Sequence, residues 1–156
     1  MEMTGQQLIP VTQDVTWRAL NDTQMLKDCI PGCEELEQVS DTQYALVMRA
    51  KIGPVSARFK GTMTLSDLDP PHGYTMTFEG QGGVAGYAKG QANVELVPEG
   101  EATRLAYAVK AMIGGKIAQL GARLIDGVAR KLAEDFFTAF NKRVSAASAG
   151  GPAENT

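Results

Sequence analysis

The side chains best suited to metal binding or nucleophilic catalysis are few and far apart in this sequence. Cys29 and Cys33 are spaced C-x3-C around a Pro-Gly turn, and the only histidine, His72, lies in a Pro-Pro-His-Gly turn. A metal site usually needs three or four nitrogen or sulfur ligands, and a catalytic base must lie within hydrogen-bonding distance of the proton it removes. We therefore predict two reduced thiols, a solvated histidine, no metal and no cofactor.

Two glycine-rich segments invite a phosphate-binding interpretation. The segment GQGGVAG at residues 80–86 does not fit the GxGxxG register, and a strand pattern rather than a helix follows it. Gly114-Gly115-Lys116 lacks the upstream glycine and the following Ser or Thr of a phosphate loop. Neither segment predicts a nucleotide site, and no catalytic residue is predicted.

Length and charge limit the classes of protein that remain. The 156 residues are 44% hydrophobic, which is enough for one domain with a core. The net charge of −3 argues against nucleic-acid binding, which normally requires a basic excess. No stretch reaches the roughly 18 to 20 apolar residues that span a bilayer, and residues 1–10 do not resemble a secretory signal. We expect a soluble cytoplasmic protein.

The elements that position these residues follow from hydrophobic periodicity. Residues 2–9 are expected to form a strand, and residues 13–20 and 23–29 two short helices capped by Thr12 and Thr23. From residue 34 to residue 113 apolar and polar residues alternate, which predicts about six further antiparallel strands with one buried face. The expected sheet therefore has about seven strands.

A long amphipathic helix is predicted to cover the buried face of that sheet. The apolar side chains spaced by three and four residues are Ile117, Leu120, Leu124, Val128, Leu132, Phe136 and Phe140. The fold class is therefore α+β, with a curved antiparallel sheet wrapped around a C-terminal helix. We assign residues 1–144 to a single domain and residues 145–156 to a disordered tail.

Small residues occupy inward positions where a packed core would normally place large ones. Glycine accounts for 17 residues of the chain, and several glycines fall inside the predicted strands and helix. Two interpretations stay open: close helix–sheet packing, or space for an apolar ligand. The residues predicted to line such a cavity are Met48, Phe59, Met63, Met76, Phe78, Ala88, Gly90, Ala92, Tyr107, Gly121, Leu124 and Val128.

Several segments together resemble a known family. They are LNDTQMLKDCIPGCEELE, KIGPVSARFKGTMTLSDLDPP, YAKGQA and GGKIAQLGARLIDGVARKLAEDFF. They are similar to the CoxG family of carbon monoxide dehydrogenase proteins, within the SRPBCC or START-like helix-grip superfamily, and the likeness runs from about Met1 to Phe140. The resemblance implies a helix-grip domain with an apolar cavity and an accessory role beside a molybdenum hydroxylase. It also implies a link to the quinone pool or to the inner face of the cell membrane, and it supplies no catalytic residue.

Three functions remain compatible with the sequence. The first is a non-enzymatic module that binds a quinone or lipid in the cavity, with molybdenum hydroxylase subunits as partners. The second is a docking or membrane-tethering protein that uses a basic strip of the long helix, comprising Lys116, Arg123, Arg130, Lys131, Lys142 and Arg143. The third is an enzyme of the polyketide-cyclase kind whose acid or base would be Tyr44, Tyr87, Tyr107 or His72.

Overall fold

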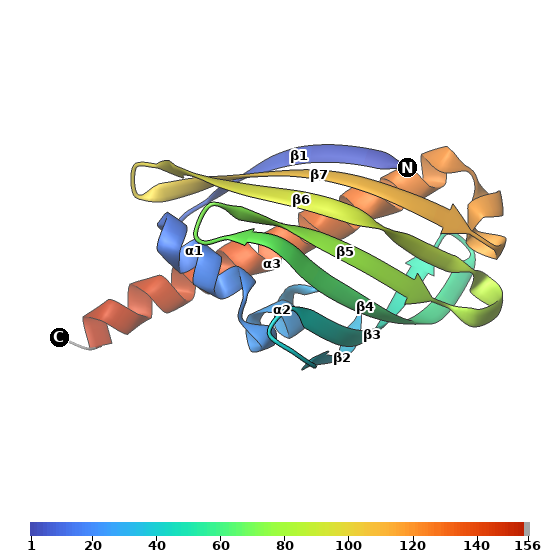
Figure 1. Cartoon of the computed structure of the whole chain (residues 1–156), viewed down its shortest axis with the longest axis horizontal. Coiled ribbons are helices and arrows are strands. Elements are labelled where there is room, and N and C mark those ends of the chain that lie inside the picture. Colours follow the sequence, from blue (N-terminus) through green and yellow to red (C-terminus); the bar gives the residue numbers. More distant parts are fainter. Residues whose placement is uncertain (155–156) are drawn as a thin grey trace.

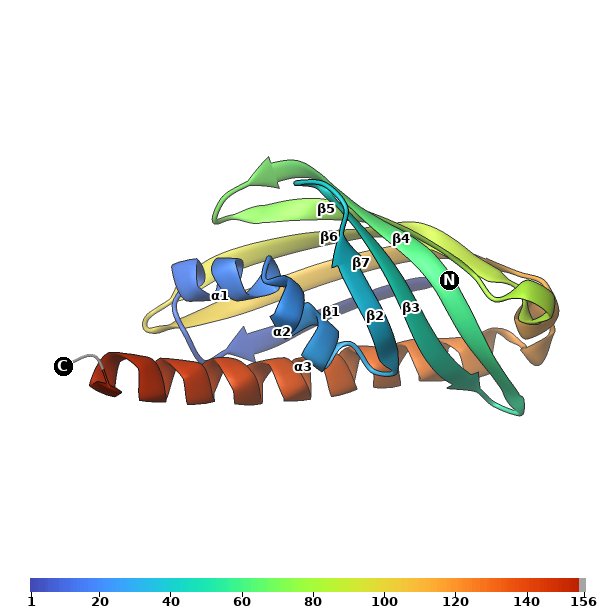
Figure 2. The same ribbon diagram turned by 90° about the horizontal axis from the view of Figure 1, so that it is seen from below.

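The chain forms a curved sheet that closes over one long helix (Figures 1 and 2). The computed structural model describes the backbone of residues 1–154 and the side chains of residues 1–147. The elements are β1 (Glu2–Ile9), α1 (Gln13–Leu20), α2 (Thr23–Cys29), β2 (Cys33–Gln38), β3 (Gln43–Ile52), β4 (Val55–Asp69), β5 (Gly73–Gln81), η1 (Gly83–Ala85), β6 (Tyr87–Glu99), β7 (Ala102–Gly114), η2 (Lys116–Leu120) and α3 (Ala122–Glu154). The predicted α+β class and seven-stranded sheet are confirmed.

All neighbouring strands of the sheet are antiparallel, in the order β1-β7-β6-β5-β4-β3-β2. The two edge strands are β1 and β2, and α3 runs beneath the concave face between them (Figure 2). A tight turn at Gly53-Pro54 joins β3 to β4, as the sequence predicts, and pairs Ile52 with Val55. Gly53 has a φ of +59°, a conformation that glycine adopts without steric cost.

Glycines inside the strands allow neighbouring strands to approach closely where the sheet bends. A Cβ atom added at Gly61 would lie 2.5 Å from the carbonyl oxygen of Glu79 on β5. A Cβ atom at Gly90 would meet the carbonyl oxygen of Lys110 and lie 2.7 Å from the Cα of Ala111, both on β7. These two glycines are therefore explained by strand–strand approach, and neither by helix–sheet packing nor by space left for a ligand.

The two short helices have the predicted bounds, but their capping differs from the prediction. The side chain of Asp22 accepts a hydrogen bond of 3.1 Å from the backbone N–H of Met25, so Asp22 caps α2 instead of Thr23. Thr12 holds the N-cap position of α1 without a side-chain capping bond. Its hydroxyl therefore contributes no cap to the helix.

The long helix begins later than its apolar periodicity predicts. Residues 116–120 form the short 3₁₀ helix η2, and Gly121, with a φ of +96°, separates η2 from α3. At the other end α3 continues through Glu154, past the domain end predicted at residue 144. Residues 155–156 of the predicted tail lie outside the described residues, and the boundary at residue 144 stays a prediction.

The densely packed core lies at the end of the molecule covered by α1 and α2. Its most buried members are Ile9 and Phe140, both 0% exposed, and Leu105, 1% exposed. The hydroxyl of Thr103 donates a 2.8 Å hydrogen bond to the carbonyl of Val11, so this buried polar group is satisfied. The core therefore joins β1, β7 and α3 at one end of the sheet. It does not extend over the rest of the concave face.

Substitution of Gly127, inside α3, and of Gly121, just before it, tests where the helix begins. The residue is exposed inside the helix, and a Cβ atom there meets nothing within 4 Å. Gly127→Ala is therefore expected to raise the free energy of unfolding by about 0.5–1 kcal/mol, measured by urea denaturation. Gly121→Ala is the matched control, because open space surrounds it too but its φ of +96° strains alanine. Equal stabilisation by both substitutions would contradict the helix break at Gly121.

Candidate functional site

A cavity of about 500 Å³ separates the concave face of the sheet from α3. Its wall is built from α1, α2, η2, α3, β1 and β3–β7. Alternation along each strand explains the wall: on β3, for example, Tyr44, Leu46, Met48, Ala50 and Ile52 all face inward. The cavity therefore results directly from the period-two pattern of the sequence.

The structure places most of the predicted lining residues on this wall. They are Met48, Phe59, Met63, Met76, Phe78, Ala88, Ala92, Tyr107 and Val128. Tyr107 stacks on Phe137 of α3 with a ring separation of 5.7 Å, which ties β7 to the helix at one side of the cavity. That these residues contact a ligand stays a prediction.

The other three predicted lining residues lie elsewhere. Gly90 packs against the backbone of β7, as described above. Gly121 is exposed at the break between η2 and α3. Leu124 is 36% exposed, and its side chain lies against the β3–β4 turn at Gly53. Gly121 and Leu124 lie at the late start of α3, where Ile125 and not Leu124 faces the cavity, and the space beside Gly90 is taken by the backbone of β7.

Several wall residues were absent from the sequence prediction. Many of them are inward positions of the strands, and the alternation of the sequence indicates their side of the sheet. Examples are Leu46, Tyr74, Gly80, Val109 and Ala111. Leu26 and Ile30, at and after α2, belong to the wall through tertiary packing. Contacts of this tertiary kind cannot be predicted from a local sequence pattern.

Three tyrosines lie on the largely apolar wall, and two of them, Tyr44 and Tyr74, are neighbours, whereas Tyr107 stacks on Phe137. Tyr44 is 2% exposed, and burial raises the pKa of its phenol, with a smaller contribution from the nearby Asp22 carboxylate. Burial also raises the pKa of Tyr74, and the neighbouring Tyr44 adds to that shift. Among the described residues neither hydroxyl has a hydrogen-bond partner. Both phenols therefore stay neutral in the physiological range and are available to a ligand.

Tyr74 marks the position of this polar region within the molecule. Its ring meets the ring of Trp17 on α1 edge to face, with centroids 5.6 Å apart. The tyrosine pair therefore lies at the α1–α2 end of the cavity. The far end reaches Ile113, Ile117 and Ile125, near the start of α3.

The wall carries no lysine, arginine or histidine among the described residues. Met1 also borders it, and its ammonium group donates a 2.8 Å hydrogen bond to the carbonyl of Ala111 on β7. The one acidic residue is Glu79, which is exposed and lies between the inward positions Phe78 and Gly80. Alternation along β5 directs the Glu79 side chain to the opposite face of the sheet. A charged ligand group would thus be buried in this cavity without a side chain of opposite charge.

Of the candidate catalytic residues, Tyr44 and Tyr107 lie on the cavity wall, and Tyr87 and His72 lie away from it. His72 is in the β4–β5 turn, with its Nδ1 3.4 Å from Nε2 of Gln13. The ring of Tyr87 covers Gly114 on the neighbouring strand. Cys29 and Cys33 are free, and burial raises the pKa of both thiols, which makes them weaker nucleophiles at neutral pH.

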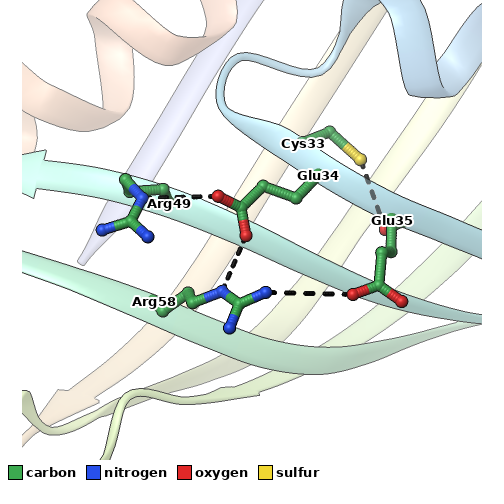
Figure 3. Close-up of polar contacts among 5 residues, drawn as sticks. All are labelled: Cys33, Glu34, Glu35, Arg49 and Arg58. Carbon is green, nitrogen blue, oxygen red and sulfur yellow. Dashed lines mark hydrogen bonds and ion pairs between the residues drawn. The ribbon is translucent and has the colours of Figure 1, made fainter.

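A charged cluster occupies the convex face of the sheet (Figure 3). Glu34 on β2 accepts hydrogen bonds from Nε of Arg58 at 2.7 Å and from Nε of Arg49 at 3.3 Å. These bonds lower the pKa of the Glu34 carboxyl, and Glu35 lies 3.9 Å from Arg58. The cluster joins β2, β3 and β4 on the side facing away from the cavity, where exposed ion pairs contribute little to stability.

Among the helices of the described residues, none combines the length and hydropathy needed to cross a bilayer. No group of three or more metal-ligating side chains occurs in the same part of the chain.

Comparison with known proteins gives a family and a fold. The family model for the carbon monoxide dehydrogenase protein CoxG matches residues 5–145. A conserved protein from Geobacillus kaustophilus is similar, with 30% identity, a TM-score of 0.89, and coverage of 94% of this chain and 97% of that one. No curated protein matches.

More distant structures share the fold alone. A START superfamily protein from Mycobacterium smegmatis is 13% identical, with a TM-score of 0.71 and coverage of 93% of this chain and 97% of that one. An aromatase/cyclase from a Streptomyces species is 10% identical, with a TM-score of 0.69 and 95% coverage of each chain. The predicted helix-grip architecture is confirmed by these likenesses.

Proposed function

The chain belongs to the CoxG family of carbon monoxide dehydrogenase proteins, and we propose that it is a non-enzymatic accessory protein that carries a neutral quinone in its cavity. Its partner is a molybdenum hydroxylase of the carbon monoxide dehydrogenase type. The quinone links that enzyme to the inner face of the cell membrane. The single observation that carries the choice of ligand is a largely apolar cavity in whose described wall the buried phenols of Tyr44 and Tyr74 form no hydrogen bond.

Cavity size and chemistry together support a hydrophobic ligand. A volume of about 500 Å³ falls in the range of about 300–1,000 Å³ typical of small-molecule sites. Binding would be driven mainly by burial of apolar surface, at roughly 25 cal/mol per Å². The described wall has no lysine, arginine or histidine, and the ammonium group of Met1 at its border already donates a hydrogen bond to the carbonyl of Ala111. This disfavours a carboxylate or phosphate, because such a group would lose its hydration without gaining a side chain of opposite charge.

The tyrosine pair supports a carbonyl-bearing head group. The phenol hydroxyls of Tyr44 and Tyr74 can each donate a hydrogen bond, and a quinone carbonyl accepts one. The prenyl tail would then run past Phe78 and Ala88 towards Ile117. Among lipids, a neutral quinone fits this arrangement better than a fatty acid or a phospholipid.

An enzymatic role of the cyclase kind receives less support. A catalytic acid or base works best with a pKa near the operating pH. Burial moves the pKa of Tyr44 and Tyr74 upward, away from that range. His72 lies outside the cavity wall, so it cannot assist either phenol there.

The proposal predicts that removing the hydroxyl group of Tyr44 lowers the affinity for the quinone. Tyr44→Phe keeps the ring and removes the donor, so the affinity for a short-chain menaquinone analogue should fall about tenfold, the value of one hydrogen bond. Tyr87→Phe is the matched control and should bind as the wild type does. Ligand-dependent shifts in melting temperature measure both affinities.

A second comparison tests the choice of ligand class. Oleate, which carries a charged head, should raise the melting temperature less than the quinone analogue at equal concentration. A wild-type protein that responds to oleate but not to the quinone would contradict the proposed ligand. Association with the hydroxylase is tested separately, by purification of the tagged protein from cells that express the enzyme.

A further inference from the structure

Three segments meet at the end of the molecule opposite α1 and the C-terminus (Figures 1 and 2). They are residues 51–54 at the β3–β4 turn, residues 82–86 of the η1 loop, and residues 112–124, which include η2. We call these three segments the tip. Gly86 lies against Gly114 and Gly115, and Gly53 lies against Leu124. The tip is therefore one continuous structural feature built from distant parts of the chain.

The tip exposes large apolar side chains. Val84 in η1 is 95% exposed, Met112 at the end of β7 is 57% exposed, and Leu124 at the start of α3 is 36% exposed. Gly83 and Gly86, with φ values of +62° and +118°, hold the loop in a conformation that projects Val84 away from the sheet. A group of exposed apolar residues at one end of a molecule is typical of an interaction site. Leu8, Leu68 and Val97 are also exposed at the opposite end, so the charge of each end must distinguish them.

Exposed cations accompany these apolar residues. Lys51, just before the β3–β4 turn, Lys116 in η2 and Arg123 in α3 are all exposed, and none takes part in an ion pair among the described residues. Residues 50–57, 80–90 and 110–125 contain no aspartate or glutamate, although the whole chain carries a net charge of −3. The tip is therefore a basic region on an acidic protein.

Two of the four other cations of the predicted basic strip on the long helix are paired with carboxylates. Lys131 pairs with Asp135 at 3.0 Å, and Arg143 pairs with Asp28 at 3.4 Å. The other two, Arg130 and Lys142, form no ion pair among the described residues, and Lys142 follows Asn141, whose side chain donates to the carbonyl of the exposed Leu8. Lys116 and Arg123 differ from them in lying at the tip, where the surrounding segments carry no acidic residue.

We propose that the tip docks on a bilayer containing anionic lipid. Val84 and Leu124 enter the boundary between headgroups and acyl chains, while Lys51, Lys116 and Arg123 lie beside lipid phosphates. The cavity wall reaches the same end through Ile113, Ile117 and Ile125, so docking places that end of the cavity against the membrane. The docking surface stands on exposure and charge, and its use for ligand exchange rests on the proposed function.

Vesicle co-sedimentation tests the docking surface. Wild-type protein should bind vesicles of phosphatidylcholine mixed with phosphatidylglycerol more strongly than phosphatidylcholine alone, and high salt should weaken the binding. Val84→Glu should lower the partition coefficient about tenfold by removing the inserted side chain. Val97→Glu is the matched control, because Val97 is a 45% exposed valine at the opposite end of β6, and it should bind as the wild type does.

Charge reversal gives an independent measurement. The double variant Lys116→Glu and Arg123→Glu should lower the partition coefficient at least about tenfold, and Lys142→Glu, near the other end of α3, should change it little. Equal effects of the tip and control variants would overturn the proposal. So would tip variants that bind vesicles normally but no longer co-purify with the hydroxylase, because the tip would then be a protein interface.

Quinone binding in solution separates this proposal from the proposed function. All four variants lie outside the cavity wall and should bind the short-chain analogue as the wild type does. Vesicle binding without quinone binding would refute the carrier function and leave the docking surface in place. Quinone binding by a wild type that binds no vesicles would refute the docking surface alone.

Discussion

Gly80→Leu is expected to abolish most quinone binding while making the unliganded protein more stable. Gly80 lies on the cavity wall in line with Phe78, and a Cβ atom there meets nothing closer than the carbonyl oxygen of Ala88 at 4.0 Å. A leucine side chain therefore extends into the cavity without striking a neighbouring strand. The affinity for the quinone analogue should fall roughly tenfold to hundredfold, because overfilling a packed site costs about 1–3 kcal/mol.

The opposite signs of the two effects make this prediction specific. Filling an apolar cavity commonly adds about 0.5–2 kcal/mol to the free energy of unfolding, so the melting temperature without ligand should rise while the ligand-dependent shift disappears. Thr77→Leu introduces the same side chain at an exposed position of the same strand, and its quinone affinity should stay at the wild-type value. A folded Gly80→Leu variant with unchanged affinity would show that the ligand does not occupy this cavity.

Gly90→Leu would be a poor substitute for that experiment. From the sequence, Gly90, and not Gly80, is assigned to the cavity lining. The close approach of the Lys110 carbonyl to Gly90 means that any side chain there disrupts the pairing of β6 with β7. Loss of binding by a Gly90 variant would therefore report loss of the fold.

The strand faces could be predicted from sequence because each depends on local alternation alone. Met48 and Phe59 were assigned to the inward face by the period of two, and their pairing across β3 and β4 places them side by side on the cavity wall. The role of Gly90 depends instead on how close β7 lies, which is set by curvature accumulated over several strands. No window of residues around position 90 contains that information.

The start of the long helix illustrates a second limit. Ile117, Leu120 and Leu124 keep a spacing of three and four residues across the break, because a 3₁₀ turn and an α-helical turn place apolar residues at similar intervals. The φ of +96° at Gly121 cannot be read from that pattern. Leu124 was consequently assigned to the cavity, whereas it lies against the β3–β4 turn.

The tyrosine pair illustrates a third limit. Alternation along β5 already puts Tyr74 on the inward face, together with Met76 and Phe78. Its importance comes from a hydroxyl that lacks a partner beside Tyr44, and the two tyrosines belong to strands separated by β4. Hydrogen-bond satisfaction is a property of the folded molecule, so the sequence could suggest the position of Tyr74 but not its use.

Phe140→Ala is expected to cost about 3–5 kcal/mol of the free energy of unfolding, whereas Phe78→Ala should cost roughly 1–2 kcal/mol. Phe140 is 0% exposed and stacks on Phe136 with ring centroids 5.7 Å apart, so its removal leaves a new void in dense packing. Phe78 borders a cavity that already exists, and its loss forfeits fewer contacts. Urea denaturation of both variants measures the difference.

The comparison tests whether the cavity persists in solution without a ligand. If the sheet and α3 closed together when empty, Phe78 would become a core residue, and both alanine variants would lose a similar amount of stability. The total free energy of unfolding of a typical domain is only about 5–15 kcal/mol, so Phe140→Ala could leave the protein unfolded. In that case Phe140→Leu, which is expected to cost less than about 1.5 kcal/mol, provides a folded reference. If Phe140→Ala loses much more free energy of unfolding than Phe78→Ala, the packed core at the α1–α2 end provides most of the stability. The cavity between the sheet and α3 then stays open without a ligand.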